Sequence, residues 1–174
     1  MVLQARQRLS DDHYAVNEVL KQLLTALESD DPQTFYSRLD LLWARLAVHI
    51  RAEHLHLFPA LAARLGEAQP IIDQLRADHD FFMRELARAI AIFRELPPQS
   101  LTAKNDTKLA SVTGIIREIA ERLATHNKVE EDQIYRWSSE MLSETEQLEL
   151  LAHINAELEN RPPRFSAEAW ANRL

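Results

Sequence analysis

Four histidines interrupt stripes of apolar residues that recur at helical spacing, and each belongs to a different stretch of the chain. They are His13, His49, His79 and His126. A single histidine on such a stripe is usually a hydrogen-bonded core residue. Four of them are harder to explain in that way, because neutral imidazole is the commonest protein ligand for metal ions. The pattern favours a metal site, provided that the four stretches bring these side chains to the same level.

The spacing to the helix ends places the four histidines at one level. Nearly equal numbers of residues separate His13 and His49 from the turn at 29–31 between their helices. The same holds for His79 and His126 and the connection between theirs. With a rise of about 1.5 Å per residue, the mismatch within each antiparallel pair is only a few ångströms. The imidazoles are therefore predicted to converge on one layer of a helical bundle.

Two glutamates add carboxylates to this layer. Glu53 and Glu130 each follow one of the histidines by four residues, which places both side chains on the same helix face. A buried carboxylate without a partner is costly, so these positions require a cation. An arginine is the alternative partner, but the nearest in sequence, Arg51 and Arg136, fall off the apolar stripe. Imidazole and carboxylate ligands without a thiolate suit iron or manganese, and also zinc or copper.

The two halves of the chain repeat each other. Residues 9–20 and 75–86 share the pattern Leu-x-x-Asp-His, followed by a leucine at the same distance. Residues 49–58 and 126–135 share His-x-x-x-Glu, followed by an aliphatic and an aromatic residue. Each half thus supplies one histidine and one His-x-x-x-Glu motif. The repeat predicts a pseudo-symmetric cage for two metal ions, and helix bundles commonly hold such sites in their cores.

The elements that must position these residues are predicted from helix start and stop signals. Ser10 is a candidate N-cap for the first helix, and Asp31 followed by Pro32 opens the second. Pro59 lies inside the second stretch, so we expect a kink or an early end near Phe58. The expected helices are about 10–28, 32–65, 70–96, 107–137 and 143–158, the last opened by a capping-box sequence, with another turn or two in 166–174.

The composition agrees with one all-α domain over 1–174, with the bundle at about 9–138 and a C-terminal extension at about 143–174. The chain has only two glycines and many good helix formers. The net charge of -7 and the lack of a basic stripe argue against nucleic-acid binding. The absence of cysteine excludes disulfides, iron–sulfur clusters and thiolate zinc sites. No stretch is typical of a signal peptide or a membrane span, so we expect a cytoplasmic location and no membrane partner.

The order of these motifs resembles the hemerythrin-like, or HHE cation-binding, family. An Asp-His pair, a His-x-x-x-Glu followed by Leu57-Phe58-Pro59, a second Asp-His and a second His-x-x-x-Glu stand in the family's order. The resemblance covers about Leu9 to Trp137. It implies an up-down-up-down four-helix bundle around a non-haem di-iron site with oxo or hydroxo and carboxylate bridges. It also implies that His13 and His49 serve one iron, His79 and His126 the other, and Glu53 and Glu130 bridge them.

One position departs from the oxygen-carrying hemerythrins. Those proteins place a further histidine four residues after the third-helix histidine, and Met83 stands there in this chain. A thioether is a soft, weak ligand and a poor substitute on iron. Each iron would then keep an open position, so we expect a site that senses or reacts with O2, NO or peroxide, or handles iron, rather than a simple O2 carrier.

The sequence leaves two other functions open. The open positions also suit a di-iron oxidoreductase that scavenges NO or peroxide. The third interpretation is an interaction bundle whose metal site is vestigial. The extension from Leu142 onward would either dimerise the bundle or cover its mouth, and the sequence leaves the oligomeric state undetermined.

Several neighbours of the six candidate ligands are harder to place. We expect His56 to face the core beside the site and His54 to point away into solvent. Glu131 is the rival of Glu130 as the second glutamate ligand. Asp12 and Asp78 are interpreted as helix-start charges. Tyr14 and Tyr135 are candidate neighbours of the metal layer. His153 is expected at the surface.

Overall fold

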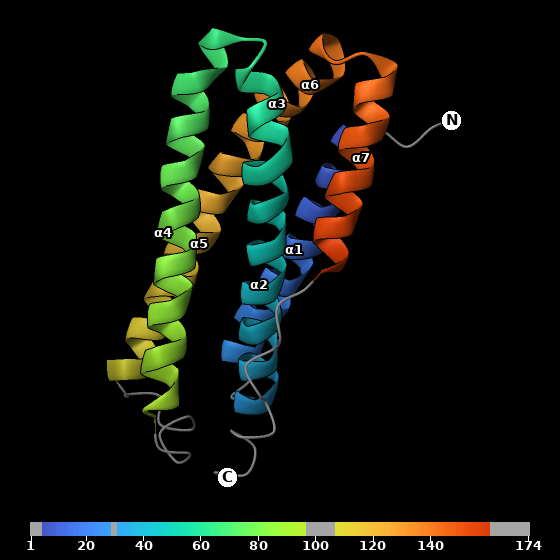
Figure 1. Cartoon of the computed structure of the whole chain (residues 1–174). Helices are drawn as coiled ribbons and strands as arrows, with labels where there is room; N and C mark the ends of the chain where they lie inside the picture. The colour runs from blue at the N-terminus through green and yellow to red at the C-terminus, as the bar shows by residue number, and fades with distance from the viewer. Residues whose placement is uncertain (1–4, 29–30, 97–106, 161–174) are drawn as a thin grey trace.

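The chain folds as a bundle of long helices. The computed structural model describes residues 5–28, 31–96 and 107–160, and within these ranges every regular element is helical. The long helices lie side by side, and the chain alternates in direction from one to the next (Figure 1). Counted along the chain, the first long helix packs on the second and on the fourth. The third long helix also packs on the second and on the fourth. The four are α1 (Ala5–Glu28), α2 (Pro32–Ala52), α4 (Gln69–Arg94) and α5 (Thr107–Val129). The predicted all-α helical bundle is confirmed.

The interior consists of two apolar clusters separated along the bundle. One cluster joins the C-terminal part of α1 and the start of α2 to the end of α4 and the start of α5. The other lies toward the opposite ends of these helices and includes the segments that come after α2 and α5. The four histidines of the repeat belong to neither cluster and are buried nonetheless. A buried polar layer therefore divides the hydrophobic core.

Helices α2 and α5 both continue through one wide turn. In each case a π-helical turn begins at the glutamate of the His-x-x-x-Glu motif, and the N–H of Phe58 or Tyr135 donates to the carbonyl five residues earlier. Of the kink or early end expected near Phe58, the early end does not occur, because the chain remains helical beyond Pro59. The same turn forms in α5, where no proline is present, so proline is not its common cause. The segments are η1 (Glu53–Leu57), α3 (Phe58–Ala62), η4 (Glu130–Ile134) and α6 (Tyr135–Met141).

Two further elements complete the described chain. A short 3-10 turn, η2 (Gly66–Ala68), connects α3 to α4. Helix α7 (Glu144–Glu159) packs on α1, α2 and η1, and its capping box pairs Ser143 with Glu146 in both directions. The expected N-cap at Ser10 is wrong, since Ser10 lies inside α1. The turn residues 29–30, the connection 97–106 and the segment 166–174 lie outside the described residues. No helix within the described ranges has the length and apolarity needed to cross a membrane.

Candidate metal centre

The six side chains predicted to bind metal meet in the polar layer between the apolar clusters. All six are buried, and the two glutamates have no exposed surface. Each long helix supplies one histidine, and each π-helical turn supplies one glutamate as its first residue. The set is His13 of α1, His49 of α2, His79 of α4, His126 of α5, Glu53 of η1 and Glu130 of η4.

Their ligand atoms form two adjoining groups. The first joins both glutamates to His13 and His49, and its ligand atoms all lie within 4.8 Å of one another. The second joins His79 and His126 to Glu130 within the same distance. Because Glu130 belongs to both groups, the two halves of the repeat form one continuous centre.

Both carboxylates span the two halves. Glu53 places Oε1 3.5 Å from Nε2 of His49 and Oε2 3.4 Å from Nε2 of His79. Glu130 does the same, with Oε2 3.1 Å from Nε2 of His13 and Oε1 3.1 Å from Nε2 of His126. A carboxylate that turns one oxygen toward each of two ligand groups has the arrangement needed to bridge two ions.

The donor atoms themselves call for a cation. Oε2 of Glu53 and Oε1 of Glu130 are buried and accept no hydrogen bond. The Nε2 atoms of His13 and His49 lie 3.1 Å apart, and those of His79 and His126 lie 2.9 Å apart. Lone pairs this close repel unless a proton or a metal ion lies between them, and buried carboxylate oxygens that accept no hydrogen bond are costly. The residues present therefore fit a metal centre.

Every one of the four histidines uses its other ring nitrogen for a second contact. These Nδ1 contacts fix the ring orientation and leave the Nε2 atoms directed at the centre, as is usual for metal-binding histidines. The contacts are His49 to Asp12 at 3.1 Å, His126 to Asp78 at 3.2 Å, His13 to Glu131 at 3.0 Å and His79 to His54 at 2.9 Å.

Asp12 and Asp78 were expected to be helix-start charges, and that interpretation is wrong. Both lie well inside their helices and are buried. Each also contacts an arginine, with Arg45 Nη1 3.3 Å from Asp12 and Arg122 Nε 2.8 Å from Asp78. Their function is to orient a histidine on the neighbouring helix. The repeat contained the signal, since each aspartate directly precedes a candidate ligand in both halves.

Replacing Asp12 with asparagine is expected to weaken metal binding roughly 10- to 100-fold, the usual cost of removing such a partner. The amide keeps the shape but loses the charge that holds the His49 ring. Competition titration with a coloured chelator measures the change. Asp11→Asn is the matched control, because Asp11 is exposed and accepts a hydrogen bond from Gln7 on its own helix. Equal affinities for the two variants would contradict the assigned role of Asp12.

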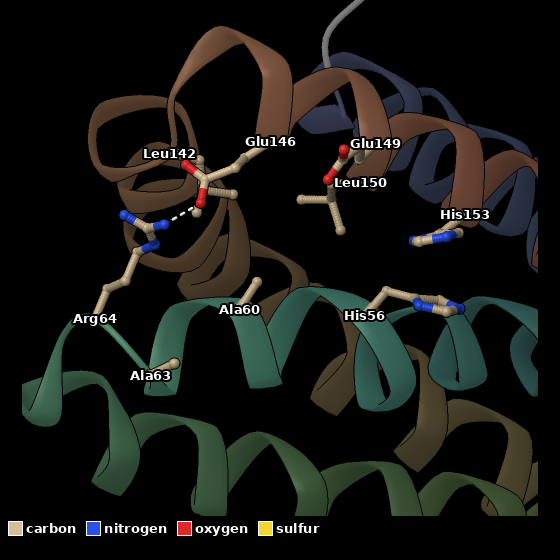
Figure 2. A pocket seen from close by; sticks show the side chains of 9 residues that line it. All are labelled: His56, Ala60, Ala63, Arg64, Leu142, Glu146, Glu149, Leu150 and His153. Carbon is tan, nitrogen blue, oxygen red and sulfur yellow. Dashed lines mark hydrogen bonds and ion pairs between the residues drawn. The ribbon is translucent and has the colours of Figure 1, made fainter.

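The predicted positions of His54 and His56 are reversed. His54 is half-buried and contacts His79, whereas His56 faces α7, where its ring stacks on His153 at 4.8 Å. Figure 2 shows His56 and His153 facing each other at one end of a pocket of about 310 Å³ between α7 and the α2–α3 segment. The π-helical turn explains the error. It adds a residue to one turn, so positions beyond Glu53 shift around the axis relative to an α-helical projection.

The same wide turn brings Tyr135 into the centre. Its side chain is fully buried, and its hydroxyl donates to Glu53 Oε1 at 2.7 Å and lies 2.9 Å from His13 Nε2. Burial and the negative charges of the two central glutamates raise the pKa of Tyr135 well above 10. Tyr14, the other tyrosine expected near the metal layer, is 70% exposed. The equivalent position in the first half of the repeat is Phe58.

Protons balance the charge of the centre in the metal-free protein. Burial lowers the pKa of His49, but the charge of Glu53 and the hydrogen bond with Asp12 outweigh it, and the pKa lies well above 6.5. The pKa of His126 is also raised, because Glu130 outweighs the effect of burial. Burial raises the pKa of Glu130, but the contacts with His126 hold it well below 4.5. A metal ion must therefore displace these protons in order to bind.

A helical bundle with a buried cluster of histidines and glutamates is typical of a class of metal-binding proteins. The family model described as Hemerythrin HHE cation binding domain matches residues 4–138. The chain belongs to this family, as the order of the sequence motifs predicted. No curated protein and no solved structure matches the chain significantly.

Proposed function

We propose that this protein binds two iron ions in the centre and uses them to sense or react with a small ligand such as O2, NO or peroxide, or to handle iron. The observation that carries the proposal is the pair of adjoining ligand groups that share Glu130. The first group provides two imidazole nitrogens and two carboxylates, and the second provides two imidazole nitrogens and one carboxylate, so each half can hold one ion. A di-iron pair supplies the redox chemistry, and the chain supplies the ligands, their orientation and the exclusion of bulk water.

Iron is favoured by the types of donor atom. Imidazole nitrogen and carboxylate oxygen suit iron and manganese, and the chain has no thiolate to select a softer ion. Zinc accepts the same ligands but prefers four-coordinate sites. Manganese and zinc are therefore the alternatives that metal analysis must decide.

The ligand count leaves positions open for a small molecule. Met83 is half-buried and packs against the apolar cluster that includes the end of α4, where a thioether adds no strong ligand. His56, which was expected to face the core beside the site, faces α7 and supplies no further ligand there. The His79–His126 half thus has two imidazoles and Glu130, and Oε2 of Glu53 lies 3.4 Å from Nε2 of His79. Open positions on a redox metal favour reaction or sensing over closed storage of the ion.

Freshly purified protein, or protein reconstituted anaerobically with ferrous iron, is expected to contain about two irons per chain, as the two-ion centres of such bundles do. Elemental analysis measures the metal, and the near-ultraviolet spectrum of the oxidised protein reports a bridged ferric pair. His49→Ala should lose this stoichiometry. His153→Ala is the matched control, because His153 is an exposed histidine outside the centre. Failure to take up any metal would sink the proposal in favour of an interaction bundle with a vestigial site.

A di-iron oxidoreductase is the second candidate, because it would use the same open positions. Turnover of NO or peroxide by the reduced protein, far above that of free iron, would establish the enzyme. Binding of one equivalent without turnover would establish the sensor. Both measurements use the full chain loaded with iron.

A further inference from the structure

We propose that Tyr135 is itself a metal ligand, and that its phenol oxygen binds as phenolate to the ion held by His13 and His49. The inference rests on the proposed function, because it requires a loaded centre. It goes further in making the two ions chemically unequal. On binding, the phenol O–H bond breaks, the proton passes to solvent, and an oxygen lone pair is donated to the ion with no change in electron count.

The phenol oxygen lies among the atoms that face the ion. It is 2.7 Å from Glu53 Oε1, 2.9 Å from His13 Nε2, 3.5 Å from His49 Nε2 and 3.5 Å from Glu130 Oε2. These four atoms are the ones that the first ligand group directs inward. The outer partners of the histidines behave differently, since each contacts an Nδ1 atom on the side away from the centre. Tyr135 occupies a ligand's place rather than an outer partner's.

The spacing agrees with one shared ion. When metal–ligand bonds are about 2.0–2.2 Å, neighbouring ligands of a six-coordinate ion lie about 3 Å apart. The Nε2 atoms of His13 and His49 are 3.1 Å apart, and His13 Nε2 is 3.1 Å from Glu130 Oε2. The contacts of the phenol oxygen with His13 and Glu53 fall at the same spacing. Tyr135 therefore completes a set of five protein ligands in this half.

The two halves of the repeat differ in the residue that ends each π-helical turn. Glu53 and Glu130 both open π-helical turns, and the residue five positions on is Phe58 in one half and Tyr135 in the other. Phe58 stacks on His79 with an interplanar angle of 9° and offers no ligand atom. Among the described residues, the ligand group of the ion in the His79–His126 half has three members, His79, His126 and Glu130. We infer that the small ligand binds to that ion, because it keeps more open positions.

The experiment compares oxidised, iron-loaded protein with variants of its three tyrosines. A phenolate bound to ferric iron absorbs in the visible region by ligand-to-metal charge transfer, which carboxylates and imidazoles do not match. We expect this band in the unaltered protein and its loss in Tyr135→Phe, with iron content still about two per chain. Tyr36→Phe is the buried control and Tyr14→Phe the exposed one, at 3% and 70% exposure, and both should keep the band.

A second measurement needs no variant and so does not depend on the folding of Tyr135→Phe. Resonance Raman spectra excited in the visible band should show tyrosinate ring modes, which shift when the protein is made with ring-deuterated tyrosine. About two irons per chain without a tyrosine-sensitive band would overturn this inference and leave the proposed function standing. A band that survives in Tyr135→Phe would also overturn it. A chain that binds no iron would overturn both.

Discussion

Glu130→Gln is expected to abolish the binding of two metal ions. Among the residues that the structure describes, Glu130 alone belongs to both ligand groups. The substitution keeps the shape but removes the charge and points an amide N–H₂ at an imidazole or at the ion. The loss of affinity should exceed the roughly 10- to 100-fold loss caused by removal of an outer hydrogen-bond partner. Anaerobic titration with ferrous iron, together with elemental analysis, measures both affinity and stoichiometry.

The neighbouring glutamate provides a matched control. The Glu131 side chain is 45% exposed and contacts His13 Nδ1, on the outer side of the ring. Glu131→Gln should therefore weaken binding by roughly 10- to 100-fold and keep two ions per chain. Circular dichroism of both variants checks that the helices are intact. Full stoichiometry in Glu130→Gln, or equal losses in the two variants, would show that Glu130 does not bridge the ions.

The second large effect is an opposite pH dependence of stability with and without metal. The raised pKa values of His49 and His126 add stability to the metal-free fold below the ordinary value of 6.5. That stability is lost as the pH rises through the folded-state values, because the buried glutamates then lose their cationic partners. The lowered pKa of Glu130 acts on the acid side, where stability is lost as the pH falls below about 4.5. The metal-free protein should be most stable between these limits.

Above pH 6.5, bound metal reverses this dependence, so that the stability of the fold rises with pH. Binding requires deprotonated imidazoles, so affinity and the stability it adds both rise with pH. Thermal unfolding monitored by circular dichroism between about pH 5.5 and 8.5, with chelator or with bound metal, tests this. In a domain of this size each 1 kcal/mol corresponds to roughly 2–4 °C in Tm. His49→Gln should flatten the metal-free slope, and His153→Gln should leave it unchanged. A metal-free Tm that rises across this range would refute the charge balance described for the centre.

The centre and its helices were largely predictable from local patterns. Helical periodicity places a histidine and a glutamate four residues apart on one face, whatever the helix packs against. The repeat then indicated that the motif occurs twice and that two ions are expected. The start of α1 was not predictable in the same way. Ser10 is a good N-cap by type, but Ala5 and Leu9 are buried in the apolar cluster beside α7, and this packing extends the helix past it.

Contacts between helices were beyond the sequence pattern. Asp12 and His49 are 37 residues apart in the chain, so their contact depends on how two helices are rotated against each other. Helical periodicity gave the face of each residue but not its partner. Asp12 therefore looked like a helix-start charge until α1 and α2 were packed together.

The two π-helical turns show most clearly which features the sequence determined and which only the tertiary structure decided. The types and spacing of His13, His49, Glu53 and their repeat by themselves predicted that these side chains share the inner faces of a helical bundle, because four residues make about one α-helical turn in any context. Only the tertiary structure decided the course of the helix beyond each glutamate. A π-helical turn changes the hydrogen-bond partner by one residue and leaves no mark in composition or periodicity. That shift turns His54 toward His79 and carries the Tyr135 hydroxyl in among the ligand atoms.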